Sequence, residues 1–404
     1  MIEPFSILML VTGALLVGEI TAATAVHFLK RTCQWIVTPQ DLSPTIDIPG
    51  LDKFIAHGWD PELGWCRKPN TNGIDTGWGE THAAYSIDPL GARSSPGYAD
   101  ARISVLAYGD SYTFCRQVED TETWPEQLSH ALNARVANFG IGNYGLDQAL
   151  LRLEREYDKC PAPVVIIGVV PETISRVLSV WKHFSEYGNT FAFKPKFSLS
   201  DKDELALIEN PVQTYEQFFA IDKCLPLLQK QDFFYQRKFV PDMLRFPYLW
   251  HLWHSRKRNL PLLKAALCDR MAHEGRNAFN QVMKRNINIA AELYCEHEPV
   301  MLLRTIVQRF ANFTRQKGAI PVLVFLPQLY DLHLIRSGDH YYANFLDRIS
   351  NELEIIDLGP MFAASNKDAD NYIDDRYGGH LSAAGNRLAA QKIAETIKTL
   401  LNVT

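Results

Sequence analysis

A serine and a distant histidine are the residues of this sequence best suited to nucleophilic chemistry. Ser111 lies in the stretch 103–114, ISVLAYGDSYTF, directly after a short apolar run rich in β-branched residues. Such a run predicts a buried strand, and a helix-like segment follows the serine. Open α/β sheets keep their sites at the carboxyl ends of strands, where the amino end of the next helix offers unpaired N–H groups to a developing oxyanion.

His380, near the carboxyl terminus, could be the base that such a serine needs. It follows two carboxylates, Asp374 and Asp375, and a glycine pair, and Ser382 beyond it is a candidate N-cap for a final helix. A serine hydroxyl is a weak nucleophile at its own pKa. A histidine within hydrogen-bond reach, itself oriented by a carboxylate, activates it.

The two stretches resemble conserved blocks of the SGNH (GDSL-type) hydrolase superfamily, in particular its membrane-tethered bacterial members. GDS at 109–111 resembles the first block, and HLSAAGN at 380–386 resembles the last block, which carries the catalytic histidine. The similar segments span 60–197 and 300–404. The resemblance implies a flavodoxin-like, three-layer, doubly wound parallel sheet with Ser111 as nucleophile and His380 as base.

The acid that would orient His380 departs from the family pattern. The superfamily places an aspartate three residues before the histidine, where this sequence has Tyr377. Asp375 and Asp374 lie five and six residues upstream, and a bulge at the glycine pair would let one of them reach the ring. We expect Asp375 to be the partner, with Asp374 as the alternative.

The expected oxyanion hole combines the N–H of Ser111 with the loop NFGIGNYG at 138–145, which resembles the glycine block of the superfamily. Gly142 is the candidate for close backbone approach, and Asn143 is the candidate donor. The third block normally supplies an asparagine in a GxND pattern. Here GVVPETI at 168–174 has Val170 in its place, so Asn143 or the segment 179–189 must replace that donor.

Composition excludes several other classes of protein. The chain has 404 residues and a formal net charge of −5, which argues against a nucleic-acid-binding surface. Its seven cysteines lack CxxC spacing, so neither a disulfide framework nor a zinc site is expected. His251 and His254 are interpreted as packing or surface residues. No metal or cofactor is predicted, and no phosphate-binding loop follows the first strand.

The first thirty residues predict a membrane anchor. Residues 4–29 form an apolar run with a single charge, Glu19, and basic residues follow it at Lys30 and Arg31. About 20 such residues suffice to span a bilayer. Because no basic residue precedes the run, we expect an uncleaved single-pass anchor, with a cleaved signal peptide or a buried helix as alternatives. The side of the membrane on which the remaining chain lies stays open.

The predicted organisation has four parts. Residues 1–31 form the anchor, 32–100 a connector with a loop and hairpin layer, 101–190 together with 299–404 the catalytic domain, and 191–298 a helical insertion that caps the substrate. The insertion contains YLWHLWHSRKRNLPLLK at 248–264. This mixture of aromatic and basic residues suits a helical cap, a carbohydrate platform or an interfacial membrane contact.

The resemblance implies an SGNH-type serine esterase or O-acyltransferase that forms an acyl-enzyme on Ser111. The expected substrate is a small-molecule or carbohydrate ester, such as an O-acetylated sugar. A catalytically degenerate SGNH-fold protein that binds or scaffolds at the membrane is the alternative. The absent third-block asparagine and the displaced aspartate favour that alternative, whereas Ser111 and His380 favour the enzyme.

Overall fold

The computed structural model describes residues 4–76, 82–200, 202–273, 275–373 and 379–401, and these residues form two compact units. Unit 1 comprises residues 1–48, 179–193 and 214–285, and unit 2 comprises 49–178, 194–213 and 286–404. Each unit is therefore built from three separate stretches of the chain. Asp374 and Asp375, the two candidate partners of His380, lie outside the described residues.

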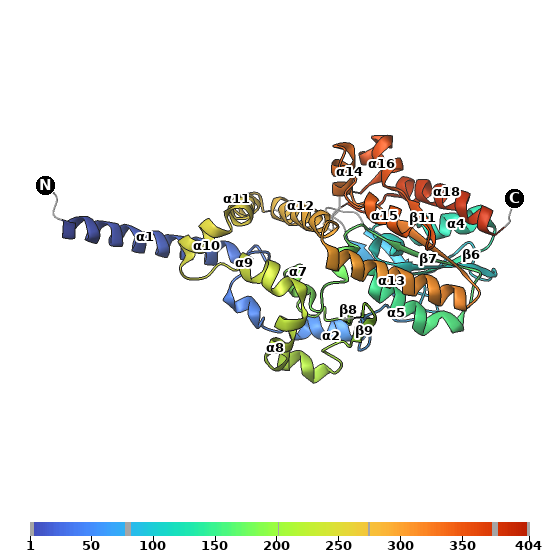
Figure 1. Ribbon diagram of the computed structural model, residues 1–404, viewed down its shortest axis with the longest axis horizontal. Coiled ribbons are helices and arrows are strands. Elements are labelled where there is room, and N and C mark those ends of the chain that lie inside the picture. The colour runs from blue at the N-terminus through green and yellow to red at the C-terminus, as the bar shows by residue number, and fades with distance from the viewer. Residues whose placement is uncertain (1–3, 77–81, 201, 274, 374–378, 402–404) are drawn as a thin grey trace. The chain divides into compact units, whose positions relative to one another are not determined.

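Unit 2 is built around a five-stranded parallel sheet (Figure 1). The strands are β5 (Ile103–Gly109), β6 (Arg135–Gly140), β7 (Val164–Val169), β10 (Ile320–Phe325) and β11 (Glu354–Asp357). Their spatial order is β11-β10-β7-β5-β6. Counted along the chain this is the 2-1-3-4-5 order of flavodoxin-like folds. The predicted fold class and the predicted strand before Ser111 are confirmed.

Helices cover both faces of this sheet, which gives the three layers expected from the resemblance. The strands are apolar throughout, because a parallel sheet is buried on both faces. One set of inward residues, including Val105, Ile166 and Val324, packs with α4 (Trp124–Leu132) and α18 (Ala383–Leu400) in a single core. On the other face lie α5 (Leu146–Glu156) and α13 (His297–Gln316), as Figure 1 shows.

Short elements complete unit 2 around the sheet. They are α2 (Ile48–His57), β1 (Trp59–Asp60), β2 (Gly64–Trp65), β3 (Asn72–Thr76), β4 (His82–Ser86), α3 (Ser111–Phe114), α6 (Thr173–Arg176), β8 (Lys196–Leu199), β9 (Leu205–Ile208), α14 (Leu329–Arg336), α15 (Ala343–Ile349), α16 (Gly359–Ser365) and α17 (Asp368–Asn371). The pairs β1–β2, β3–β4 and β8–β9 are antiparallel. Helix α2 lies in the stretch predicted as a connector, where Pro49 and Gly50 in its first turn hide the helical pattern.

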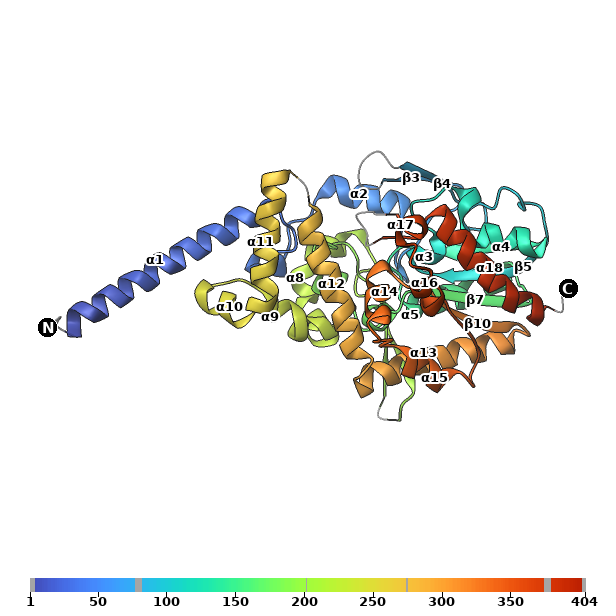
Figure 2. The ribbon, with the colours of Figure 1, turned by 90° about the horizontal axis from the view of Figure 1, so that it is seen from above.

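Unit 1 is helical, and its longest helix is the apolar α1 (Pro4–Lys30) (Figure 2). Its other helices are α7 (Lys182–Ser185), α8 (Ile221–Gln231), α9 (Val240–Asp242), α10 (Tyr248–His254) and α11 (Arg256–Ala272), and α12 (Arg276–Leu293) runs from unit 1 into unit 2. Val26 and Leu29 of α1 are buried in one apolar cluster with Leu262 and Ala266 of α11. One face of the carboxyl-terminal half of α1 is thus part of the unit's core.

Helix α1 is long and apolar enough to cross a membrane, by length and composition. Only 6% of its most apolar window is buried, unlike the core helix of a soluble domain. Its one acidic residue, Glu19, accepts hydrogen bonds from the backbone N–H groups of Tyr248 at 2.6 Å and Leu249 at 3.0 Å. Glu19 therefore satisfies two of the unpaired N–H groups at the start of α10.

Candidate active site

Ser111 and His380 meet at the carboxyl-terminal edge of the sheet. Strand β5 ends at Gly109, Asp110 is the N-cap of α3, and Ser111 is the first residue of that helix. The Nε2 atom of His380 lies 2.9 Å from the Oγ atom of Ser111. Both residues are buried. Two residues 269 positions apart thus lie at the hydrogen-bond distance that a nucleophile and its base require.

The turn before Ser111 can be made only by glycine. Gly109 has a φ of +148°, and a Cβ atom there would lie 1.8 Å from the carbonyl oxygen of Gly168 on the neighbouring strand. Gly140, at the end of β6, is equally confined, since a Cβ atom would lie 2.2 Å from the backbone nitrogen of Phe114. The absence of side chains lets three strand ends and α3 approach closely, which fixes the position of Ser111.

Asp110 holds this turn in place and is fully buried. Its Oδ1 atom accepts a hydrogen bond from the Tyr112 N–H at 2.8 Å, and its Oδ2 atom accepts one from the Val170 N–H at 2.9 Å. The Arg176 guanidinium lies 3.1 Å from the same carboxylate. Asp110 therefore ties the start of α3 to the end of β7, a structural role next to the nucleophile.

Tyr112 positions the loop that carries His380. Its hydroxyl donates a hydrogen bond to the carbonyl oxygen of Gly379 at 2.7 Å, and its ring lies 4.7 Å from the imidazole ring between centroids. The carbonyl oxygen of His380 also accepts a hydrogen bond from the Ile373 N–H at 2.8 Å. The helix that carries the nucleophile thus also supports the base.

We expect Tyr112→Phe to weaken catalysis without preventing folding. The variant keeps the ring against His380 and loses the hydrogen bond to Gly379, which should cost about 1 kcal/mol of folding stability. Looser placement of the imidazole should lower kcat several-fold and leave KM nearly unchanged. Steady-state kinetics with a short acyl ester, beside urea unfolding, measure both effects. A kcat equal to that of the wild type would show that Tyr112 does not position His380.

The loop expected to supply oxyanion donors follows β6, beside the nucleophile. Gly142 and Asn143 are both half-buried, and Asn143 adopts a left-handed φ of 66°. A Cβ atom on Gly142 would meet nothing within 4 Å, so space is open at that position. The Trp65 indole donates to the Gly142 carbonyl at 2.9 Å and so fixes this peptide. Val170, at the place of the missing asparagine, is fully buried and contributes no side-chain donor.

A buried polar network lies below the site, at the ends of β7 and β10. Arg176 joins Asp110 to Glu172, whose carboxylate lies 3.2 Å from the guanidinium. Glu172 in turn accepts a hydrogen bond of 3.4 Å from the Gln328 side chain. Asp331 accepts one from the Gln328 backbone N–H at 2.7 Å and one from the Tyr341 hydroxyl at 2.7 Å. Burial raises the pKa of Asp331 to about 7.

This pKa predicts a pH dependence of folding stability. The folded carboxyl group keeps its proton up to about pH 7, whereas in the unfolded chain it ionises near its ordinary pKa of 3.8. Its contribution to stability is therefore fully present below about pH 4 and is lost as the pH rises through about 7. The loss is at most about 4 kcal/mol, since one pKa unit corresponds to about 1.4 kcal/mol.

Asp331→Asn should remove that dependence, because an amide does not ionise. Urea unfolding of both proteins at about pH 4.5 and about pH 7.5 gives the comparison. We expect the wild type to lose more stability than the variant over this range. An identical loss in the two proteins would contradict the assignment to Asp331.

Arg93 is a site residue that the sequence did not identify. It is buried, and its guanidinium donates to the carbonyl oxygens of Phe114 and Cys115 at 2.7 Å and of Val118 at 2.6 Å. Its Nε atom pairs with Asp120 at 2.7 Å. One side chain therefore holds the whole segment that follows the nucleophile.

The segment 179–189, considered as a replacement for the missing donor, lies in unit 1. Trp181 stacks on Phe193 with 5.0 Å between ring centroids, and Lys182 pairs with Glu186 at 2.8 Å. The amide nitrogen of Asn189 donates to the Glu186 carbonyl at 3.0 Å. The side chains of this segment thus have structural partners within their own unit.

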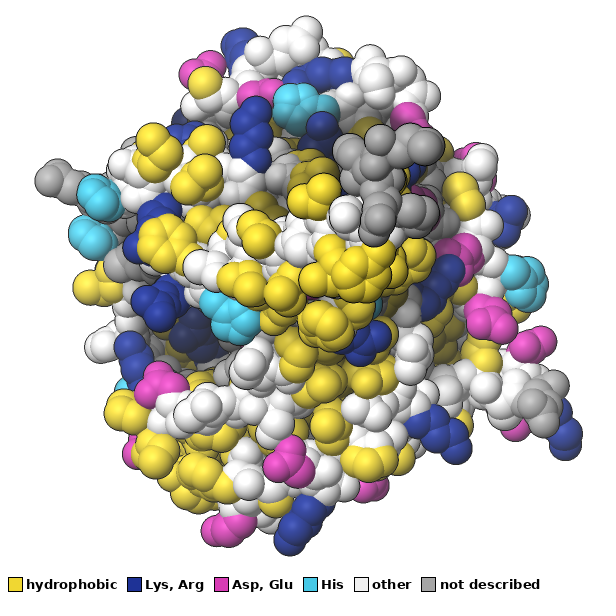
Figure 3. Space-filling model, turned by 90° about the vertical axis from the view of Figure 1, so that its left-hand side faces the viewer, with side chains coloured by type: hydrophobic (Ala, Val, Ile, Leu, Met, Phe, Trp, Pro, Cys, Tyr) yellow, Lys and Arg dark blue, Asp and Glu magenta, His cyan; other side chains and the backbone are white. Residues whose placement is uncertain are grey.

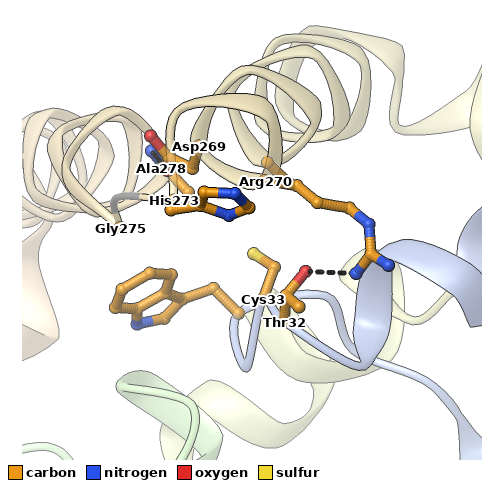
Figure 4. A pocket seen from close by; sticks show the side chains of 9 residues that line it. Thr32, Cys33, Asp269, Arg270, His273, Gly275 and Ala278 are labelled. Carbon is orange, nitrogen blue, oxygen red and sulfur yellow. Dashed lines mark hydrogen bonds between the residues drawn. The ribbon is translucent and has the colours of Figure 1, made fainter.

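A cavity of about 450 Å³ lies at the end of α1, within unit 1 (Figure 4). Thr32, Cys33, Arg270 and His273 are among the residues that line it. Asp269, also in its wall, is used as an acceptor by the backbone N–H groups of Asn277 and Ala278. The cavity does not contain Ser111 or His380 and is separate from the candidate active site.

Comparisons with known proteins find similarity in structure only. No protein-family model and no curated protein sequence matches the chain. A structure assigned to the G-D-S-L family of lipolytic proteins, from Desulfitobacterium hafniense, is 14% identical. The match covers 73% of this chain and 99% of that one, with a TM-score of 0.30. A lipase/acylhydrolase from Enterococcus faecalis is 11% identical over 74% of this chain and 96% of that one, also with a TM-score of 0.30.

Because both scores are low, the fold assignment rests on the strand order of this chain. That order, and the placement of the GDS turn after the first strand, are those implied by the resemblance. The chain has a flavodoxin-like α/β fold. The expectation of a flavodoxin-like, doubly wound parallel sheet is thereby confirmed.

Proposed function

We propose that this protein is a serine esterase or O-acyltransferase that forms an acyl-enzyme on Ser111. The observation that carries the proposal is the 2.9 Å contact between the Ser111 hydroxyl and the His380 imidazole. His380 takes the hydroxyl proton as Ser111 attacks the ester carbonyl, and then returns it to the departing alcohol. Water, or a second hydroxyl compound, accepts the acyl group in the next step.

The proposed oxyanion donors lie at the start of α3 and in the loop after β6. The N–H of Ser111 is at the amino end of a helix, where it has no helical acceptor. Asn143 and the peptide at Gly142 would complete the hole. One of the two aspartates, Asp375 or Asp374, would hold the His380 tautomer. The proposed substrate is a small or carbohydrate ester, such as an O-acetyl sugar.

A fluorophosphonate probe tests the proposal directly, since it reacts covalently with activated serines. We expect the full-length protein in detergent to be labelled once, and Ser111→Ala to remain unlabelled. Ser129→Ala serves as a control, because the Ser129 hydroxyl donates to the Pro125 carbonyl at 2.9 Å and lies outside the site. No labelling of folded, monodisperse wild type would favour the alternative, a binding or scaffold protein on a degenerate SGNH fold.

We also propose that α1 is an uncleaved, single-pass membrane anchor. Its carboxyl-terminal half shares a core with α11, and its Glu19 side chain accepts hydrogen bonds from α10. Removal of α1 as a signal peptide would expose that core and leave those N–H groups without their acceptor. Resistance of the protein to extraction from membranes by alkaline carbonate tests the anchor independently of catalysis.

A further inference from the structure

Exposed aromatic side chains gather on and next to α10. Phe246 is 75% exposed, Trp250 is 61% exposed and Trp253 is 66% exposed. Large aromatic side chains contribute the most apolar area per residue and are usually buried. Several exposed together, beside a long apolar helix, indicate a surface that contacts another phase or another molecule.

The charged side chains within the segment that carries these aromatics are all basic. Residues 243–268 contain no aspartate or glutamate. Arg245, Arg256, Lys257 and Lys264 in this range are all exposed. The Arg256 guanidinium lies over the Trp253 ring, 4.5 Å from its centroid. In the view of Figure 3, hydrophobic side chains are interspersed with Lys and Arg side chains, and some acidic side chains also lie on this face.

The position of α10 along α1 is fixed by direct contacts. The Glu19 carboxylate accepts hydrogen bonds from the first two N–H groups of α10. The two helices also pack closely at Gly18, where an added Cβ atom would lie 3.0 Å from the Leu249 side chain. From Pro4 to Glu19 a helix extends about 24 Å, at about 1.5 Å per residue. This length approaches the hydrocarbon thickness of a bilayer, which is about 30 Å. The difference of about 6 Å places the start of α10 near the boundary at which α1 would leave the hydrocarbon.

We infer that α10 and the adjoining residues Phe246 and Arg256 form a second membrane contact, which lies in the headgroup layer of an anionic bilayer. This inference rests on the proposed anchor, because α1 sets the depth of α10. Tryptophan rings favour the boundary between hydrocarbon and headgroups. Arginine and lysine side chains extend from that depth to lipid phosphates.

Depth-dependent quenching of tryptophan fluorescence tests the contact in the full-length protein. The protein is reconstituted in vesicles that contain anionic phosphatidylglycerol and lipids with bromine atoms near the headgroup or near the methyl end of the acyl chain. We expect the shallow bromines to quench more than the deep ones. Trp250→Phe together with Trp253→Phe should remove most of the quenched amplitude. Trp59→Phe, a half-buried tryptophan of unit 2, should leave it unchanged.

Reversal of two basic charges provides a second test of the membrane contact. Arg256→Glu with Lys257→Glu should reduce the shallow quenching in anionic vesicles and have little effect in purely zwitterionic ones. Quenching that persists in the double tryptophan variant would overturn the inference. So would unquenched tryptophans in a protein that forms concentration-dependent dimers, because the surface would then be covered by a second copy. Fluorophosphonate labelling and carbonate extraction report separately on the proposed activity and anchor.

Discussion

His380→Ala should slow ester turnover by about 100- to 10,000-fold while the protein stays folded, since this is the usual contribution of a general base. The imidazole Nε2 atom, 2.9 Å from the Ser111 hydroxyl, is the described group placed to take the proton from that hydroxyl. The variant retains Ser111 and the surrounding turn. Its reaction with a fluorophosphonate should be slowed to a similar extent.

Imidazole in the buffer distinguishes a lost base from a distorted site. If the cavity left by the ring admits imidazole, turnover by His380→Ala should rise with its concentration. His333→Ala is the matched control, because His333 is an exposed histidine of the same unit. That control should keep wild-type turnover. Wild-type turnover by the His380→Ala variant would contradict the proposed mechanism.

Arg93→Ala should be the most destabilising single substitution near the site. It breaks an ion pair with Asp120 and leaves the carbonyl oxygens of Phe114, Cys115 and Val118 without their donor. Removal of one partner from a buried pair typically costs about 3–5 kcal/mol. The free energy of unfolding in urea measures the loss, and circular dichroism reports whether the variant folds at all.

Arg93→Lys keeps the charge but offers only a point donor in place of the planar fork, so we expect an intermediate loss. Arg102→Ala is the control, since Arg102 is exposed, and it should change stability by about 0.5 kcal/mol or less. Equal stabilities of Arg93→Ala and Arg102→Ala would contradict the role given to Arg93. If Arg93→Ala does not fold, the free energies of unfolding of the wild type, Arg93→Lys and Arg102→Ala still provide the comparison.

The sheet could be predicted because its strands have a strong local signal. Residues 164–169 are apolar and β-branched at nearly every position, and helices with one apolar face alternate with such runs. Strand order followed from the resemblance. Helix α2 was not predicted, because proline and glycine in its first turn also signal a loop. The domain boundaries drawn from sequence remain predictions.

The candidate site was predictable only where a motif marks it. Ser111 and His380 belong to the GDS and HLSAAGN blocks, and the structure brings them together. Arg93 and Arg176 act through carbonyl oxygens and carboxylates that are distant in the sequence. Local patterns carry no signal for such pairings. The choice between Asp375 and Asp374 falls outside the described residues and stays a prediction.

The core that α1 shares with α11 also bears on how the chain folds during synthesis. Val26 and Leu29 emerge from the ribosome more than two hundred residues before their partners Leu262 and Ala266. If α1 is inserted into the membrane first, as proposed, Val26 and Leu29 remain without their packing partners until α11 has been synthesised. Unit 1 would then complete its folding late in synthesis, by packing α11 on a helix that is already inserted in the membrane. A chain shortened to begin at residue 32 should therefore expose Leu262 and Ala266 and aggregate, even though the sheet of unit 2 remains complete.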